Sequence, residues 1–123
     1  MKQVCVPGNG GGITYSTTET LTGDTWIDGK PIYRKVIDFG TLPNKGGKQV
    51  EHGITNLDKF IKIWGFCYLP SDPYETYPLP YLNTDSLGYG AALMMVASKK
   101  IYIRDGYDLS RLMAYVILEY TKN

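Results

Sequence analysis

The segment from Gly23 to Pro43 reads GDTWIDGKPIYRKVIDFGTLP and contains a turn, a long strand and a stop. Asp28-Gly29 stands between two hydrophobic pairs, which is a hairpin signal because both residues tolerate the positive φ angles of tight hairpin turns. Pro31 lacks an amide donor, so it belongs at the first residue of a strand or on an edge. Residues 32–39 are rich in β-branched and aromatic side chains and are followed by a glycine. We therefore predict a strand leading out of a tight turn.

Four motifs follow one another along the chain, and the first of them lies in this segment. They are TWIDGKPIYRKVIDFG (25–40), HGITNLDKFIKIWG (52–65), PLPYLN (78–83) and VILEYTKN (116–123). In this order they resemble a domain near the C-terminal end of phage and prophage tail-fibre and receptor-binding-type proteins, and the resemblance covers roughly residues 15 to 123. It implies a virion protein of a tail fibre or other surface appendage, assembled in the host cytoplasm beside other tail or fibre proteins. It names no ligand.

The composition limits the classes of protein to consider. A chain of 123 residues fits one domain and buries about two-thirds of its unfolded surface, so it needs no disulfides to fold. Thirteen basic and twelve acidic residues give a net charge of +1 without charge blocks, so we expect no nucleic-acid partner. No apolar run of about 18 residues and no basic-then-apolar leader occurs, so we expect neither membrane insertion nor secretion.

The N-terminal residues 1–12 end in a glycine-rich run and are predicted to be an arm or linker, either joined to a shaft or free. Residues 13–123 would form the tip domain. Cys5 and Cys67 allow two interpretations: free thiols packed as small apolar side chains, which we expect, or a bridge that pins the arm. Zinc needs more ligands than this chain can cluster, so we expect no metal and no cofactor.

Short extended segments separated by turn signals follow one another over residues 13–123. Residues 13–21 read as a first strand before a Gly23-Asp24 turn, and residues 54–59 as a connection or a single helical turn capped by Thr55 or Asn56. Four prolines between residues 70 and 80 exclude a helix and a central strand there. Seven to nine such strands amount to an all-β, antiparallel sandwich or jelly roll.

The C-terminal third contains two further predicted units. Residues 91–98 and 101–104 are expected to form a hairpin. Residues 112–121 could be a short helix or a strand, and their valine, isoleucine and tyrosine favour the strand, as does the resemblance.

The segment from Phe60 to Leu69 alternates between two faces, both largely apolar. An antiparallel sheet usually exposes one face to solvent, so we expect the aromatic face to be buried, either by a loop of this chain or by a neighbouring subunit. The resemblance implies three copies, because tail fibres are commonly three-stranded, and we expect a homotrimer. The candidate interface residues are Phe60, Trp64, Phe66 and Tyr68.

Eleven tyrosines make the composition unusual, and several alternate with acids in segments expected to be exposed loops. Sugar rings stack on aromatic faces while carboxylates accept hydrogen bonds from hydroxyls, so this mixture suits a host-surface glycan. The alternative is that these rings cover strand edges and subunit seams. The candidate ligand-binding residues are Asp72, Tyr74, Glu75, Tyr77, Asp105, Tyr107 and Asp108.

We find no catalytic constellation in the sequence. His52 would need a nucleophile such as Ser98 or Cys67, and no motif brings them together, so we expect a loop or edge histidine. The aspartates stand beside turns, where they are ordinary turn residues. We therefore expect no enzyme.

Three functional hypotheses remain. The first is a virion tip domain that recognises a host glycan and homotrimerises. The second is a purely structural trimerisation or decoration protein without a ligand. The third is a secreted carbohydrate-binding module, which lacks the signal sequence that it would need.

Overall fold

The computed structural model describes residues 14–80 and 92–123, and every regular element in these ranges is a β-strand. The strands are β2 (Thr20–Thr25), β3 (Pro31–Thr41), β4 (Gly47–Glu51), β5 (Leu57–Leu69), β6 (Asp72–Leu79), β7 (Ala92–Ala97), β8 (Lys100–Asp105) and β9 (Met113–Lys122). Five form a sheet in the order β2-β3-β9-β5-β6, and three form a second sheet in the order β4-β8-β7. The predicted all-β antiparallel domain is therefore confirmed.

Two compact units share these strands, and β3, β5 and β9 run from one unit into the other. The described part of the first unit comprises residues 14–37, 55–63 and 117–123. The second comprises residues 38–54, 64–80 and 92–116.

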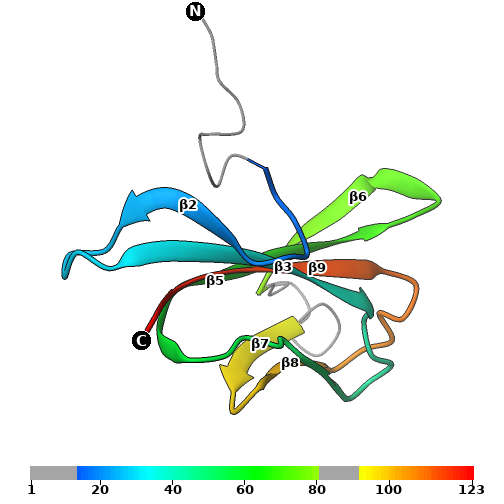
Figure 1. Ribbon diagram of the computed structural model, residues 1–123. Coiled ribbons are helices and arrows are strands. Elements are labelled where there is room, and N and C mark those ends of the chain that lie inside the picture. The colour runs from blue at the N-terminus through cyan, green and yellow to red at the C-terminus, as the bar shows by residue number, and fades with distance from the viewer. Residues whose placement is uncertain (1–13, 81–91) are drawn as a thin grey trace, which may run out of the picture. The chain divides into compact units, whose positions relative to one another are not determined.

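The predicted hairpin joins β2 to β3 (Figure 1). The amide of Trp26 donates to the carbonyl of Lys30 over 2.9 Å, and Gly29 has a φ of +88°, which a side chain would resist. Pro31 is the first residue of β3, as predicted. The predicted Gly23-Asp24 turn is wrong, because both residues lie inside β2, where the register with β3 shifts as in a bulge.

Tyr120 is the centre of the first unit, with a fully buried side chain. Its ring packs parallel to that of Tyr33 and edge-on to that of Phe60, with 6.1 Å between centroids in each pair. Its hydroxyl donates to Glu19 over 2.6 Å, and Lys122 pairs with the same carboxylate at 3.0 Å. The closing segment is thus a strand, as predicted, and it carries core residues.

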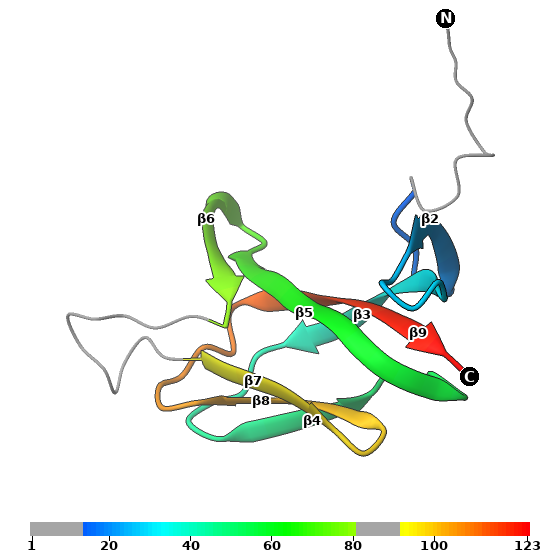
Figure 2. The ribbon, with the colours of Figure 1, turned by 90° about the vertical axis from the view of Figure 1, so that its left-hand side faces the viewer.

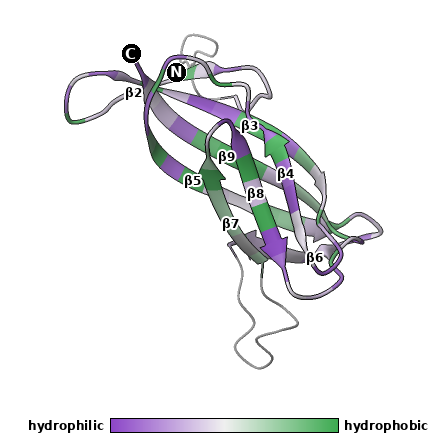
Figure 3. Cartoon of the chain, turned by 90° about the horizontal axis from the view of Figure 1, so that it is seen from below, coloured by the Kyte–Doolittle hydropathy of each residue, from purple (hydrophilic) through white to green (hydrophobic). Residues whose placement is uncertain are grey.

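The second unit has two layers, formed by β4, β8 and β7 and by the ends of the longer strands together with β6 (Figure 2). Between them lie buried side chains that include Phe39, Leu79, Ile101, Ile103 and Val116. Hydrophilic and hydrophobic bands succeed one another along β8 (Figure 3), because the buried Ile101 and Ile103 alternate with Lys100, Tyr102 and Arg104, whose side chains face away from this core. The predicted hairpin of β7 and β8 is confirmed.

The predicted helical turn before residue 60 is wrong, because β5 begins at Leu57. Asn56 instead adopts a left-handed φ of 56°, which asparagine tolerates, and its carbonyl accepts a hydrogen bond from the amide of Asn123. The proline-rich segment provides β6, the last strand of the larger sheet, so its predicted edge position is confirmed. Cys67 is a buried free thiol, whereas Cys5 and the predicted arm lie outside the described residues.

Candidate functional site

The first group of predicted ligand residues lies on β6, not in a loop as predicted. Prolines at an edge cost no ladder hydrogen bond when they face outward, so the segment pairs with β5 in spite of them. Tyr74 is 98% exposed, and its amide donates to the side chain of Asp72 over 3.3 Å. The edge strand therefore presents an open aromatic ring.

Glu75 and Tyr77 form a hydrogen-bonded set with Arg111. The hydroxyl of Tyr77 donates to Oε2 of Glu75 over 2.9 Å, and the Arg111 guanidinium donates to the same oxygen over 3.0 Å. These bonds, that of Tyr77 first, lower the pKa of the Glu75 carboxyl and keep it charged. These hydrogen bonds hold a carboxylate and a guanidinium side by side on the surface of the second unit.

Asp105 does not belong to this surface, because it is only 6% exposed. Its Oδ1 accepts from the amide of Gly46 over 3.2 Å, and its own amide donates to the Gly46 carbonyl over 2.9 Å. Burial raises the pKa of its carboxyl. The prediction of an exposed Asp105 is wrong, since its carboxylate closes the turn before β4.

Tyr107 and Asp108 remain at the surface in the connection from β8 to β9. Asp108 accepts hydrogen bonds from the hydroxyl and the amide of Ser110 at 2.6 and 3.0 Å, and these lower the pKa of its carboxyl. Arg111 adds an attractive charge at Asp108 while it binds Glu75. Arg111 therefore connects the two predicted groups of ligand residues.

The four predicted interface residues are all partly buried. Phe60 belongs to the first unit, where it packs on Tyr120. Phe66 and Tyr68 belong to the second unit and share contacts with Tyr115, whose ring lies parallel to that of Tyr68 at 6.4 Å. Rings of the same chain thus cover part of the aromatic face.

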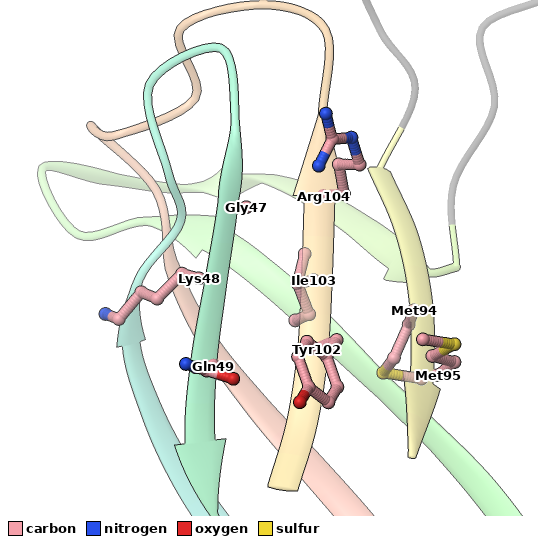
Figure 4. A pocket seen from close by; sticks show the side chains of 8 residues that line it. All are labelled: Gly47, Lys48, Gln49, Met94, Met95, Tyr102, Ile103 and Arg104. Carbon is pink, nitrogen blue, oxygen red and sulfur yellow. The ribbon is translucent and has the colours of Figure 1, made fainter. Parts of the chain in front are cut away.

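A groove of about 570 Å³ lies on the three-stranded sheet of the second unit. Figure 4 shows the side chains that line it, which come from all three strands. The residues are Gly47, Lys48, Gln49, Met94, Met95, Tyr102, Ile103 and Arg104. This volume is in the usual range for small-ligand sites.

The outer face of this sheet is defined by its register. Tyr102 alternates along β8 with the buried Ile101 and Ile103, so it lies on the opposite face of the sheet. It stands directly opposite Gln49 of β4 on one side and Met95 of β7 on the other. Arg104 follows Tyr102 on the same face, next to Gly47. Within the part of the chain that the structure describes, the side chains of Gln49, Tyr102 and Arg104 make no hydrogen bond or ion pair.

The sequence analysis missed this groove. Met95 and Tyr102 are unremarkable in their own segments and meet only through the pairing of β7 with β8. The predicted hairpin placed its turn at Lys99 and Lys100, whereas the structure has it at Ser98 and Lys99, and this register pairs Met95 with Tyr102. The third strand, β4, could not be placed without the fold.

Of the three residues considered for catalysis, His52 and Cys67 are buried, whereas Ser98 is exposed in the turn between β7 and β8. His52 lies in the connection from β4 to β5, so the predicted loop position is confirmed. Its side chain is buried, and its Nδ1 accepts from the amide of Ile54 over 3.1 Å, which gives it a structural role. Burial raises the pKa of the Cys67 thiol to about 11, which leaves it protonated at neutral pH.

In the described ranges, no group of three or more metal-ligating side chains occurs. The same ranges contain no helix long and apolar enough to span a membrane. Among known proteins, no family model, curated protein or solved structure matches this chain.

Proposed function

We propose that this chain is a non-enzymatic domain of a phage tail fibre or receptor-binding-type virion protein that homotrimerises and recognises a host-surface glycan. The order of the four motifs supports the virion assignment, and an all-β antiparallel domain agrees with it. The alternative is a structural virion protein that trimerises or decorates without a ligand.

The observation that carries the glycan proposal is the open ring of Tyr74 on the same strand as the fixed Glu75 and Tyr77. A pyranose ring can stack on an exposed aromatic face, because its C–H groups are apolar on one side. Glu75 accepts from hydroxyls, and Arg111, already held by Glu75, donates to ring or hydroxyl oxygens. Binding needs no rearrangement of this acid–base pair, so little ordering entropy opposes it.

The proposed trimer would cover the aromatic residues that this chain leaves partly exposed. A cyclic interface hides the same surface on every copy and closes, which prevents open-ended association. Several copies would also bring several weak glycan sites to one cell surface, and linked sites raise apparent affinity without new contacts.

The test measures attachment of fluorescently labelled protein to a panel of bacterial strains by flow cytometry. Tyr74→Ala should reduce attachment to the positive strains while its melting temperature stays near that of the wild type. Ile27→Ala is the matched control, because Ile27 is 89% exposed in the β2–β3 turn of the first unit and should change neither property. Undiminished attachment by Tyr74→Ala would remove β6 from the proposal, and equal loss of attachment and folding would show that the ring packs.

A further inference from the structure

We infer that the groove on the outer face of β4, β8 and β7 is a second saccharide site, selective for a sugar unit that carries a carboxylate or a phosphate. The inference rests on the proposed function, since it gives the chemical class of a glycan. In this site Arg104 binds the anionic group, and Tyr102 lies under the sugar ring.

Tyr102 provides the platform. It stands on β8, the central strand of the sheet, with Gln49 and Met95 as its cross-strand neighbours (Figure 4). Side chains opposite each other on neighbouring strands lie about 5 Å apart, so the three form one continuous strip. An apolar strip with a ring at its centre and an amide at one end matches a sugar, which has an apolar face and hydroxyls at its edge.

Three donors of this face are left for a ligand. Gln49, Tyr102 and Arg104 make no hydrogen bond or ion pair with any described residue. Lys48 differs: it donates to the carbonyl of Thr41 over 2.7 Å and lies 5.1 Å from the centre of the Phe39 ring. The lysine therefore serves the fold, and the arginine is the cation that the groove offers.

Gly47 keeps the flank of Arg104 open. A Cβ at this position would come within 3.7 Å of the guanidinium, so any longer side chain would lie against the group. Because Gly47 is the cross-strand neighbour of Arg104, a bare backbone stands beside the cation. A planar guanidinium with a free edge can donate two parallel hydrogen bonds to a carboxylate or a phosphate.

The charges around the groove favour an anion. Asp105 follows Arg104 but faces the core, where it binds the amide of Gly46. Glu51 lies on the outer face in the next row beyond Tyr102, where the positive charge of Lys100 stands opposite it. None of the residues that pair with Tyr102 or Arg104 is acidic.

The inference is tested by ¹⁵N–¹H NMR titration of the wild-type protein with glucuronate, glucose 6-phosphate and glucose. The two anionic sugars should shift the amides of Gln49, Tyr102 and Arg104 saturably, and glucose should not. Comparison of the two anionic sugars tells whether a carboxylate or a phosphate is preferred. Equal binding of glucose, or no shift in the groove with any of the three, would overturn the inference.

Two variants of β8 make the test specific. Arg104→Gln should weaken binding of the anionic sugar about tenfold or more, as expected for loss of a charge-assisted contact. Lys100→Gln removes the same charge from the same face of the same strand and should change the affinity less than about twofold, because it lies four residues from Arg104 and surface charges more than about 10 Å apart are largely screened. Tyr102→Phe should bind and Tyr102→Ala should not. Equal effects of Arg104→Gln and Lys100→Gln would contradict a site at Arg104.

The outcomes also separate the inference from the proposed function. If sugars shift the amides of β6 and leave the groove unchanged, the glycan proposal survives and the inference fails. If the anionic sugars bind in the groove but the protein attaches to no cell, the inference stands and the proposed function fails.

Discussion

Gly65→Ala tests the packing on which the second unit depends. Gly65 lies on β5, and a Cβ at this position would overlap the carbonyl oxygen of Tyr115 and lie 3.2 Å from Cα of Val116. Both neighbours are backbone atoms of β9, so no side-chain rotation can make room. The two strands would have to move apart or shift register.

The expected cost follows from this geometry. Overpacking of a well-packed core costs about 1–3 kcal/mol, and the backbone contact places this substitution near 3 kcal/mol. A domain of this size has about 0.05–0.15 kcal/mol of stability per residue, so the loss is a substantial fraction of the total. At about 3–6 °C per kcal/mol, the melting temperature should fall by about 10 °C or more.

Urea unfolding followed by tryptophan fluorescence measures this loss. Gly46→Ala is the control, because the nearest atom to its added Cβ would be 3.8 Å away, an ordinary contact, and it should stay within about 0.5 kcal/mol of the wild type. A Gly65→Ala variant as stable as the control would refute the close approach of β5 and β9.

Three further predictions concern the thiol, the acid range and the oligomer. Cys67 should react with thiol reagents only after unfolding, because it is buried and its pKa is raised to about 11, and an intact mass lower by two hydrogens would instead indicate a bridge. Hydrogen bonds from Lys59, Thr121 and Lys30 lower the pKa of Asp58, so its contribution to stability is present above the ordinary aspartate pKa of about 3.9 and is lost as the pH falls below it. Asp58→Asn should therefore flatten the fall in stability below about pH 4, and an unchanged acid profile would contradict this role. Light scattering should give three times the chain mass of 13.8 kDa at micromolar concentration, and Trp64→Asp should abolish the trimer or aggregate the chain; a monomer mass for the wild type would end the trimer proposal.

The elements that depend on neighbouring residues in the sequence, such as the β2–β3 turn and the start of β3, could be predicted. The β2–β3 turn needed a residue with positive φ, and Gly29 is one of the few that accept it. Pro31 could begin a strand and not continue a central one. These features depend on one or two residues and their neighbours, so they can be read without the fold.

Features that depend on distant partners were missed or misjudged. Asp105 looks like an ordinary turn aspartate, and only the approach of the turn at Gly46 buries its carboxylate. The Gly23-Asp24 pair reads as a turn, yet pairing with β3 extends the chain through it with a shift of register. Residues 72–77 read as a loop until β5 provides an edge on which they can pair.

The candidate site shows the same division. The tyrosine and acid pattern of β6 was visible in the sequence, and the structure confirms that Tyr74 is exposed. Arg111 could not be selected from the sequence, because its carboxylate partner, Glu75, is 36 residues away. The groove needs the register of three strands and could not be derived from any one of them.

The most direct measurement of glycan recognition is a glycan array probed with the intact wild-type protein in its native oligomeric state. We expect saturable binding to a subset of bacterial surface glycans that includes acidic ones, and reduced signals for Tyr74→Ala and Arg104→Gln. A folded wild-type protein that binds no glycan on an array of bacterial polysaccharides would contradict recognition of a glycan and favour a structural virion protein.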